Sequence, residues 1–243
     1  MISTEIRIFR AIANLQHEHI IPLRSVQMAD PYIIIVMERA DQNLADFAAN
    51  YRKQHEGNVP PEIAVGLIEQ VALALDFLSE SRFPEISPVR GLQHCDIKPT
   101  NILLVGDVVK VADFGLSAWA GWKTHSSGWR GTFPYAAPEV FRGSATRGTD
   151  QYALAMTYCE LVMGDRPFLR DDAGKQPPPN GYTVDLAQFR VEETPIFARA
   201  LHPDPSNRYQ SCMAFVEGLK RALRSQRNLS ITPPPSTFRK NLP

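Results

Sequence analysis

The chain has 243 residues, enough for one large domain or two modest lobes around a cleft, and its hydrophobic content of 44% is typical of a globular protein. Its 26 basic and 26 acidic residues balance to zero net charge without a long basic cluster, so we predict neither nucleic-acid binding nor attachment to an anionic membrane surface. Because it shows no signal-peptide pattern, no apolar run near the roughly 18 residues of a membrane span, and only three cysteines, we expect a cytoplasmic protein without a membrane span or a disulfide framework.

The first third of the chain predicts a helix, two strands and a second helix. Apolar residues recur at near-helical spacing over residues 3–16, and two apolar runs, 20–23 and 32–37, predict strands separated by the polar segment 27–31. Pro61 then opens a long helix that we expect to be buried on one side. Its expected apolar face consists of Ile63, Leu67, Val71, Leu75 and Leu78.

A short hairpin with polar ends is predicted in the middle of the chain. The apolar runs 102–105 and 108–111 flank Gly106-Asp107, the composition of a tight turn. A hairpin holds its two ends close together. Those ends carry Asp96, Lys98 and Asn101 on one side and Asp113 on the other.

Two carboxylates, an amide oxygen and an ammonium group would therefore converge on a small volume. Magnesium prefers hard oxygen ligands and usually takes one or two carboxylates, with phosphates and waters completing its octahedron. Asn101 and Asp113 suit that role, which leaves Asp96 free to accept a proton. The hairpin thus predicts a site for Mg²⁺ and phosphate.

The last third predicts a buried helix and an extended tail. Residues 150–161 are apolar on nearly all sides, which indicates a helix inside the core. Residues 170–181, with three consecutive prolines, predict a loop. From Ser225 onward the apolar content is low and prolines recur, so we expect a disordered linker over 225–243.

Three motifs in order resemble those of protein kinases: HCDIKPTN at 94–101 resembles their catalytic loop, DFG at 113–115 their metal-binding motif, and APE at 137–139 the end of their activation segment. Over residues 3–223 the chain is most similar to bacterial serine/threonine kinases of the eukaryotic type. The alternative is a charged hairpin on an unrelated fold. The resemblance implies an α+β, protein-kinase-like fold with a truncated N-lobe of helix C plus two strands and a mainly helical C-lobe. The implied divisions are 1–40 for the partial N-lobe and hinge, 41–224 for the C-lobe and 225–243 for the tail.

The resemblance also implies ATP and Mg²⁺ as cofactors and protein serine or threonine hydroxyls as substrates. Asp96 would orient and deprotonate the substrate hydroxyl, and Lys98 would steady the transferring phosphoryl group. Thr132 would bridge these two side chains, which points to serine or threonine substrates. Asn101 and Asp113 would hold Mg²⁺. The backbone of Glu38 to Ala40 would bind the adenine edge.

Other residues would have structural roles by the same resemblance. Glu5 would be the helix C glutamate that pairs with a lysine of strand three, or else a solvated glutamate in a first helical turn. His94 and Phe114 would stack in the column that links the lobes, with a proton carrier as the second interpretation of His94. Met37 would be the gatekeeper, an assignment that is compatible with an ordinary core methionine.

Two further contacts are implied in the C-lobe. Glu139 should find a buried arginine, since an unpaired buried carboxylate is costly, and Arg208 is at the matching position. Asp150 would hold the backbone of the catalytic loop. Cys95 departs from the family, because most such loops have an arginine there that grips a phosphorylated residue. Switching by phosphorylation of Thr124, Ser126 or Ser127 is therefore not expected.

The N-terminal side departs further. Only four residues precede Glu5, and the sequence contains neither G-x-G-x-x-G nor V-A-I-K, so the phosphate loop and the ATP-anchoring lysine are missing. Either the chain is a fragment or the N-lobe is lost. The first hypothesis is a serine/threonine protein kinase; the alternative is a catalytically impaired fragment or pseudokinase-like module that acts by protein binding.

Overall fold

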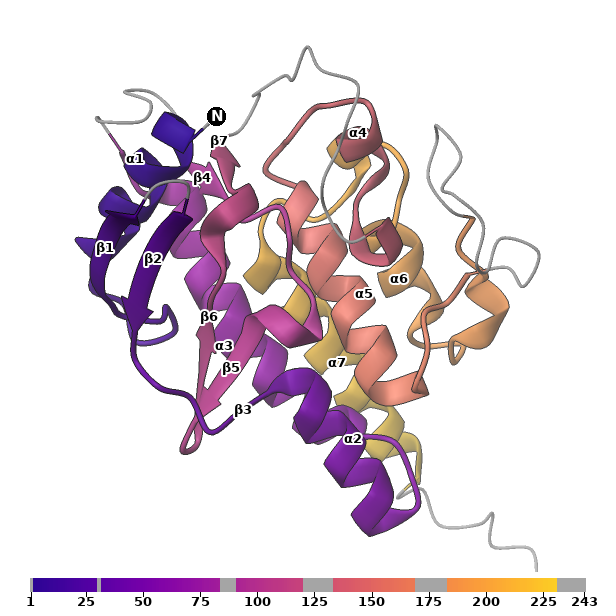
Figure 1. Cartoon of the computed structure of the whole chain (residues 1–243). Helices are drawn as coiled ribbons and strands as arrows, with labels where there is room; N and C mark the ends of the chain where they lie inside the picture. Colours follow the sequence, from indigo (N-terminus) through magenta and orange to yellow (C-terminus); the bar gives the residue numbers. More distant parts are fainter. Residues whose placement is uncertain (1, 30–31, 84–90, 120–132, 169–182, 231–243) are drawn as a thin grey trace, which may run out of the picture.

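The computed structural model describes residues 2–29, 32–83, 91–119, 133–168 and 183–230. A small N-terminal part with a β-hairpin sits beside a larger helical part (Figure 1). The longer elements are α1 (Ile2–Ala13), β1 (Leu23–Ala29), β2 (Tyr32–Met37), α2 (Leu44–His55), α3 (Pro61–Glu80), β5 (Ile102–Val105), β6 (Val108–Val111), α5 (Thr149–Met163), α6 (Thr194–Ala200) and α7 (Cys212–Ser230). The short strands are β3 (Gln42–Asn43), β4 (Leu92–Gln93) and β7 (Ala118–Trp119). Single turns are η1 (Pro99–Asn101), η2 (Phe114–Leu116), η3 (Phe133–Tyr135), α4 (Pro138–Phe141), η5 (Leu186–Gln188) and η6 (Pro205–Asn207).

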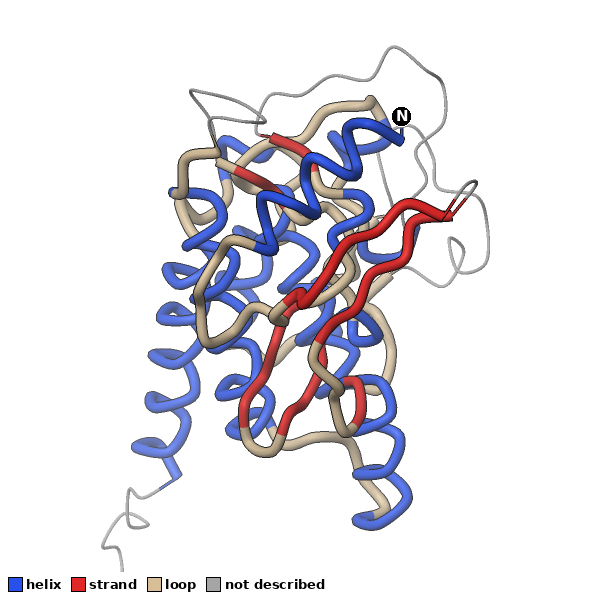
Figure 2. The backbone as a smooth tube through the Cα atoms, turned by 60° about the vertical axis from the view of Figure 1, so that its left-hand side comes forward, coloured by secondary structure: helices blue, strands red, loops and turns tan. Residues whose placement is uncertain are grey.

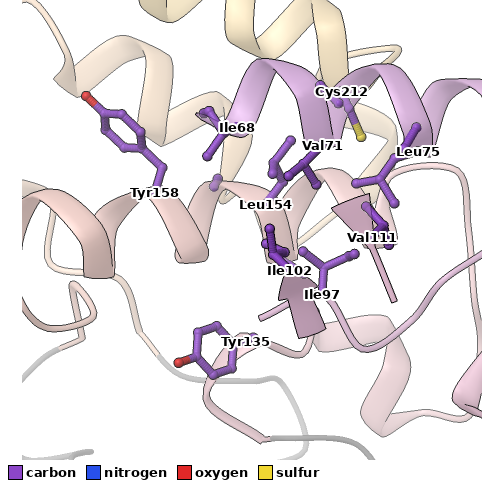
Figure 3. Close-up of a cluster of buried hydrophobic side chains, with 14 of the residues drawn as sticks. Ile68, Val71, Leu75, Ile97, Ile102, Val111, Tyr135, Leu154, Tyr158 and Cys212 are labelled. Carbon is purple, nitrogen blue, oxygen red and sulfur yellow. The ribbon is translucent and has the colours of Figure 1, made fainter. Parts of the chain in front are cut away.

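Helix α5 is the centre of the helical part. Every residue from Thr149 to Cys159 is buried, as its apolar composition on all sides predicts. Helix α3 packs against both α5 and α7. Side chains from α3, α5 and the β5–β6 region meet in one core, in which Ile68 and Val71 lie near Leu154 and Val111 (Figure 3).

The predicted face of α3 is partly wrong. Val71, Leu75 and Leu78 are buried as expected, but Ile63 is 41% exposed and its place in the core is taken by Ala64. Ala64 and Ile68 continue the i, i+4, i+7 spacing of the other buried residues, whereas Ile63 lies about 100° around the helix from Ala64. The predicted face was chosen from the larger apolar residues, so it did not include the small side chain of Ala64.

The first predicted strand is also displaced. Ile20 and Ile21 do not belong to the hairpin; they are buried, and Ile21 donates its N–H to the carbonyl of Val111 at 3.0 Å. Strand β1 begins at Leu23 and includes residues that the sequence analysis assigned to a polar linker. Pro22 explains the shift, because a residue without an N–H interrupts the ladder between the two segments. The apolar pair joins the N-terminal part to β6 instead.

The central hairpin has the predicted boundaries. β5 and β6 pair antiparallel with Ile102 opposite Val111 and Val105 opposite Val108. Gly106 closes the turn with φ of +57°, a left-handed conformation that glycine adopts without steric cost. Figure 2 shows this hairpin below the separate β1–β2 hairpin.

The tail begins later than expected. Helix α7 continues to Ser230, so residues 225–230, which the sequence analysis assigned to a disordered linker, are helical. Arginine, glutamine and leucine in this stretch are good helix formers and extend a helix already fixed by packing. Residues 231–243 lie outside the described part, as does the predicted loop 170–181. Within the described ranges, no helix is both long and apolar enough to cross a membrane.

Candidate active site

The loop before β5 is fixed by one buried carboxylate. Asp150, at the start of α5 and 2% exposed, accepts the backbone N–H of His94 at 2.7 Å and that of Cys95 at 2.8 Å. Burial raises the pKa of Asp150, while these two N–H groups favour its ionised form. Cys95 has φ of +66°, a strained conformation for a non-glycine residue that the bonds from Asp150 help to hold.

The loop then presents Asp96, which is 8% exposed. Its Oδ2 atom lies 2.7 Å from Nζ of Lys98 and accepts a hydrogen bond from Nδ2 of Asn101 at 2.9 Å. Asn101 also donates to the backbone carbonyl of Asp96 at 2.9 Å. An ammonium group and an amide therefore fix the orientation of this carboxylate, and three predicted site residues are brought together.

Asn101 and Asp113 are the two candidate magnesium ligands. Because Nδ2 of Asn101 is directed at Asp96, its Oδ1 atom is the group left to coordinate a cation. The N–H of Ala112 donates to the carbonyl of Asn101 at 2.9 Å, which places the next residue, Asp113, beside the loop. Asp113 is exposed and has φ of +63°, and its Oδ1 atom accepts the N–H of Gly115 at 3.4 Å.

This donor set fits Mg²⁺ completed by phosphate and water. An amide oxygen and an exposed carboxylate are hard ligands, and magnesium is usually bound by one or two carboxylates plus phosphates. Among the described residues, no group of three or more His, Cys, Asp or Glu side chains could hold a metal ion.

His94 is engaged by the backbone through both ring nitrogens. Nε2 lies 2.9 Å from the carbonyl of Ala112, and Nδ1 accepts the N–H of Asp96 at 3.3 Å. Since a carbonyl can only accept, this network assigns the proton to Nε2. The ring is fully buried and contacts Phe114 with centroids 4.9 Å apart. This geometry favours the interpretation of His94 as a core histidine over that of a proton carrier.

Glu139 and Arg208 form a buried bidentate ion pair. Nη1 of Arg208 lies 2.9 Å from Oε1 of Glu139, and Nη2 lies 2.8 Å from Oε2. The guanidinium also donates to the carbonyl of Gly148 at 3.0 Å, and Thr149 donates to the carboxylate at 2.8 Å. The pair therefore has the additional hydrogen bonds that buried charges need.

The segment after β2 is the one predicted to bind the adenine edge through its backbone. Its backbone is tied to the fold at Glu38, which donates its N–H to Pro22 at 3.1 Å, and at Asp41, which donates to Leu104 at 2.9 Å. In the described part of the chain, no backbone hydrogen bond uses the N–H of Ala40 or the carbonyl of Glu38. Met37 is 36% exposed, so it is not an ordinary core methionine.

Two predicted residues cannot be placed in the site. Thr132 lies outside the described residues, together with the activation-segment positions Thr124, Ser126 and Ser127. Glu5 lies in α1, as predicted for helix C, but its side chain is not among those described. The structure describes no partner for either.

A polar cluster that no sequence motif predicted lies next to the end of the activation segment. The hydroxyl of Tyr135 donates to Glu160, and Arg166 lies near both, with its guanidinium 5.6 Å from the Tyr135 ring. Burial, followed by the bond to Glu160, raises the pKa of Tyr135. Tyr135 lies 25 positions before Glu160 in the sequence, and no motif joins it to Glu160 and Arg166. The one sequence feature that could have indicated this cluster is Glu160, a charged residue within the apolar segment of α5.

Cys95 occupies a small apolar environment. It is 6% exposed and packs with Ala118 and Ala145, and burial raises its pKa well above the usual value. The thiol is thus neutral and inaccessible, as are those of Cys159 and Cys212, which are also free and buried. The side chain at position 95 offers no cation to a phosphate group.

A family model described as the protein kinase domain matches residues 1–229. The chain belongs to the protein kinase family, and the predicted α+β kinase-like fold is confirmed.

Curated relatives support this assignment. The chain is 32% identical over 233 residues to the serine/threonine-protein kinase PknF of Mycobacterium tuberculosis, an alignment that covers 88% of this chain and 45% of PknF. It is 29% identical to the probable serine/threonine-protein kinase CPE1738 of Clostridium perfringens, with 91% of this chain and 32% of that protein covered. For PknI of Mycobacterium bovis the identity is 28%, with 85% and 32% covered. The chain thus matches less than half the length of these relatives.

Proposed function

We propose that this chain is a serine/threonine protein kinase domain that transfers the γ-phosphoryl group of ATP to hydroxyl groups of protein substrates. The observation that carries the proposal is the arrangement of Asp96, which is buried, oriented by Lys98 and Asn101, and mounted on a loop that Asp150 fixes. A carboxylate that is held in a fixed orientation can accept a proton from a hydroxyl group placed beside it.

In the proposed reaction, Asp96 accepts a hydrogen bond from the substrate hydroxyl and would take its proton as the new oxygen–phosphorus bond forms. The bond between the γ-phosphorus and the oxygen that bridges to the β-phosphate breaks in the same step, and ADP leaves with that oxygen. The ammonium group of Lys98 lies beside Asp96. Its positive charge would stabilise the negative charge on the phosphoryl group during transfer. The loop is preorganised by its bonds to Asp150, so little reorganisation is needed at the moment of reaction.

The proposed cofactors are ATP and Mg²⁺. Oδ1 of Asn101 and the carboxylate of Asp113 would hold the metal ion, and the backbone between Glu38 and Ala40 would hold the adenine. When bound, Mg²⁺ neutralises charge on the phosphate oxygens and ATP supplies the phosphoryl group. Thr132 keeps its proposed role as the residue that favours serine and threonine substrates.

The test is transfer of labelled phosphate from ATP to a generic serine/threonine substrate. Asp96→Asn should lower the rate by about a hundredfold to ten-thousandfold, because the base is lost while the hydrogen bonds to Lys98 and Asn101 can be retained. Omission of Mg²⁺ should also abolish transfer. Asp107→Asn, in the turn of the same hairpin, is the matched control and should leave the rate unchanged.

A second candidate function is a non-catalytic module that binds proteins, and one observation favours it. Strands β1 and β2 contain no lysine, and the lysines at 98, 110 and 220 are paired with Asp96, Glu38 and Glu69. No described strand of the N-terminal part therefore supplies the ATP-anchoring lysine of the family. A folded chain that binds no ATP in calorimetry and transfers no phosphate would favour this candidate.

We also propose a cytoplasmic location. The chain has three cysteines, all free and buried. Reduced, unpaired thiols are typical of proteins in a reducing compartment.

A further inference from the structure

The segment that follows β2 is held to the β5–β6 hairpin at two places. At one end, Asp41 donates its N–H to the carbonyl of Leu104 in β5 at 2.9 Å, and its Oδ2 atom accepts the N–H of Gly106 in the turn at 2.8 Å. At the other end, Glu38 forms an ion pair with Lys110 of β6. The same hairpin therefore holds both ends of the segment whose backbone is proposed to bind the adenine.

The ammonium group of Lys110 connects three parts of the chain. Its Nζ atom donates to the carbonyl of Glu18 at 3.0 Å and lies 3.5 Å from Oε2 of Glu38. Glu18 belongs to the segment between α1 and β1, and the same segment accepts the N–H of Glu38 at the carbonyl of Pro22, at 3.1 Å. The contacts thus form a closed ring that runs from β6 through residues 18–22 to the segment after β2 and back.

The ion pair between Lys110 and Glu38 is shielded from water. The side chain of Lys110 is 13% exposed and that of Glu38 is 32% exposed. The Oε2 atom of Glu38 is itself buried and accepts no hydrogen bond from any described residue. A fully exposed ion pair contributes little, but a shielded carboxylate that loses its cation is costly unless it moves toward water. That movement would displace the backbone of residue 38.

We propose that Lys110 is a positioning residue, which acts through Glu38 to fix the backbone that holds the adenine relative to the magnesium ligands. This role rests on the ATP site proposed above. Asn101 lies directly before β5, and Asp113 lies shortly after β6. One hairpin thus holds both ends of the nucleotide, the phosphates through the ends of its strands and the adenine through the side chain of Lys110.

The first experiment measures the binding of ATP to the whole chain by calorimetry in the presence of Mg²⁺. Lys110→Met should raise the dissociation constant by about fivefold or more, because the adenine-binding segment loses one of its two attachments. Lys110→Arg keeps a cation and should raise it less. Lys220→Met is the matched control: Lys220 is also paired with a glutamate, Glu69, but between α7 and α3. It should leave the dissociation constant unchanged.

The kinetics should separate binding from chemistry. Lys110→Met should raise the KM for ATP and leave kcat at saturating ATP nearly unchanged, because Lys110 acts on the binding of the adenine and touches none of the reacting groups. The Mg²⁺ concentration for half-maximal rate at saturating ATP should also stay the same. A fall in kcat with an unchanged KM would contradict the positioning role.

The second experiment needs no nucleotide. In hydrogen–deuterium exchange of the free chain, the amides of residues 38–41 should exchange faster in Lys110→Met than in the original chain, whereas those of α7 should not. Glu38→Gln should also speed this exchange, and Lys110→Met should add little to it in the double variant, since the two side chains act as a pair.

The two experiments distinguish failure of the positioning role from failure of the proposed function. A chain that binds no ATP would contradict the proposed function, and the exchange of residues 38–41 would still decide the role of Lys110. Unchanged exchange of this segment in Lys110→Met, or an unchanged dissociation constant in a chain that does bind ATP, would overturn the positioning role.

Discussion

Arg208 and Glu139 join two segments of the helical part through a bidentate ion pair whose side chains are almost fully buried. Sixty-nine positions separate them in the sequence. Glu139 lies in α4, just after the activation segment, and Arg208 lies just before α7. The pair therefore ties α4 to the turn that precedes α7.

Loss of one member of this pair should destabilise the fold. Arg208→Ala should lower the free energy of unfolding by about 3–5 kcal/mol, because the carboxylate of Glu139 would stay buried without its cation. Urea denaturation measures the change. The double variant Glu139→Gln/Arg208→Met should lose less than the sum of the two single losses, since it removes both charges. Additive losses would show that the two residues are not coupled.

Asp150 should affect catalysis through the position of the loop. Asp150→Asn replaces one of the two acceptor oxygens with a donor, so the N–H of either His94 or Cys95 loses its partner. We expect a loss of about 1–3 kcal/mol in stability and a clear fall in kcat, with the KM for ATP less affected.

The chain offers a matched control for that variant. Asp76 accepts two backbone N–H groups in the same manner, from Cys212 at 2.8 Å and Met213 at 2.9 Å, but at the start of α7. Asp76→Asn should cost similar stability and leave kcat unchanged. An equal fall in kcat for both variants would mean that general destabilisation, and not loop position, limits the activity.

Asp113→Asn should weaken the dependence of activity on Mg²⁺ without unfolding the chain. The variant removes a negative charge from an exposed side chain, so its melting temperature should stay near that of the original. The Mg²⁺ concentration for half-maximal rate should rise by about tenfold or more, because ligand charge sets the affinity for hard cations. An unchanged magnesium titration would exclude Asp113 as a ligand.

The three cysteines should be unreactive in the folded chain. Burial is the main cause that raises the pKa of each thiol, so each stays protonated and shielded as the pH rises toward 8. Ellman's reagent should detect no thiol in the native protein and three after denaturation. Rapid labelling of Cys95 in the native state would instead favour a redox role for the catalytic loop.

The parts of the site that were predictable from sequence are those made by neighbouring residues. Residues 102–111 have the boundaries of a hairpin because a two-residue turn fixes the register of two short apolar runs, and that hairpin brings the ends of the site together. The bond from Asp150 to the loop and the pair between Glu139 and Arg208 were expected only through the resemblance to a family. A local sequence pattern does not predict which distant residue a buried carboxylate will contact.

The errors share a physical cause, which is that packing decided between local alternatives. Ile20 and Ile21 have strand composition, but β6 offers them a buried place outside the hairpin. Ala64 has little apolar surface, yet its small size suits the close contact between α3 and its neighbours. The double cap by Asp76 was missed because an aspartate within an apolar helix carries no sign of its distant partners.

The burial of α5 on all sides has a consequence for how the protein meets its nucleotide. Asp150 lies in α5, which is buried on all sides, and it holds the backbone of the loop at His94. The loop that carries Asp96 is therefore fixed to the rigid core. The β1–β2 hairpin belongs to a sheet of its own and makes few of these contacts. In hydrogen–deuterium exchange, amides of α5 and the catalytic loop should exchange slowly even without ATP, whereas those of β2 should exchange quickly. The loop that carries Asp96 should thus hold its conformation before any ligand arrives.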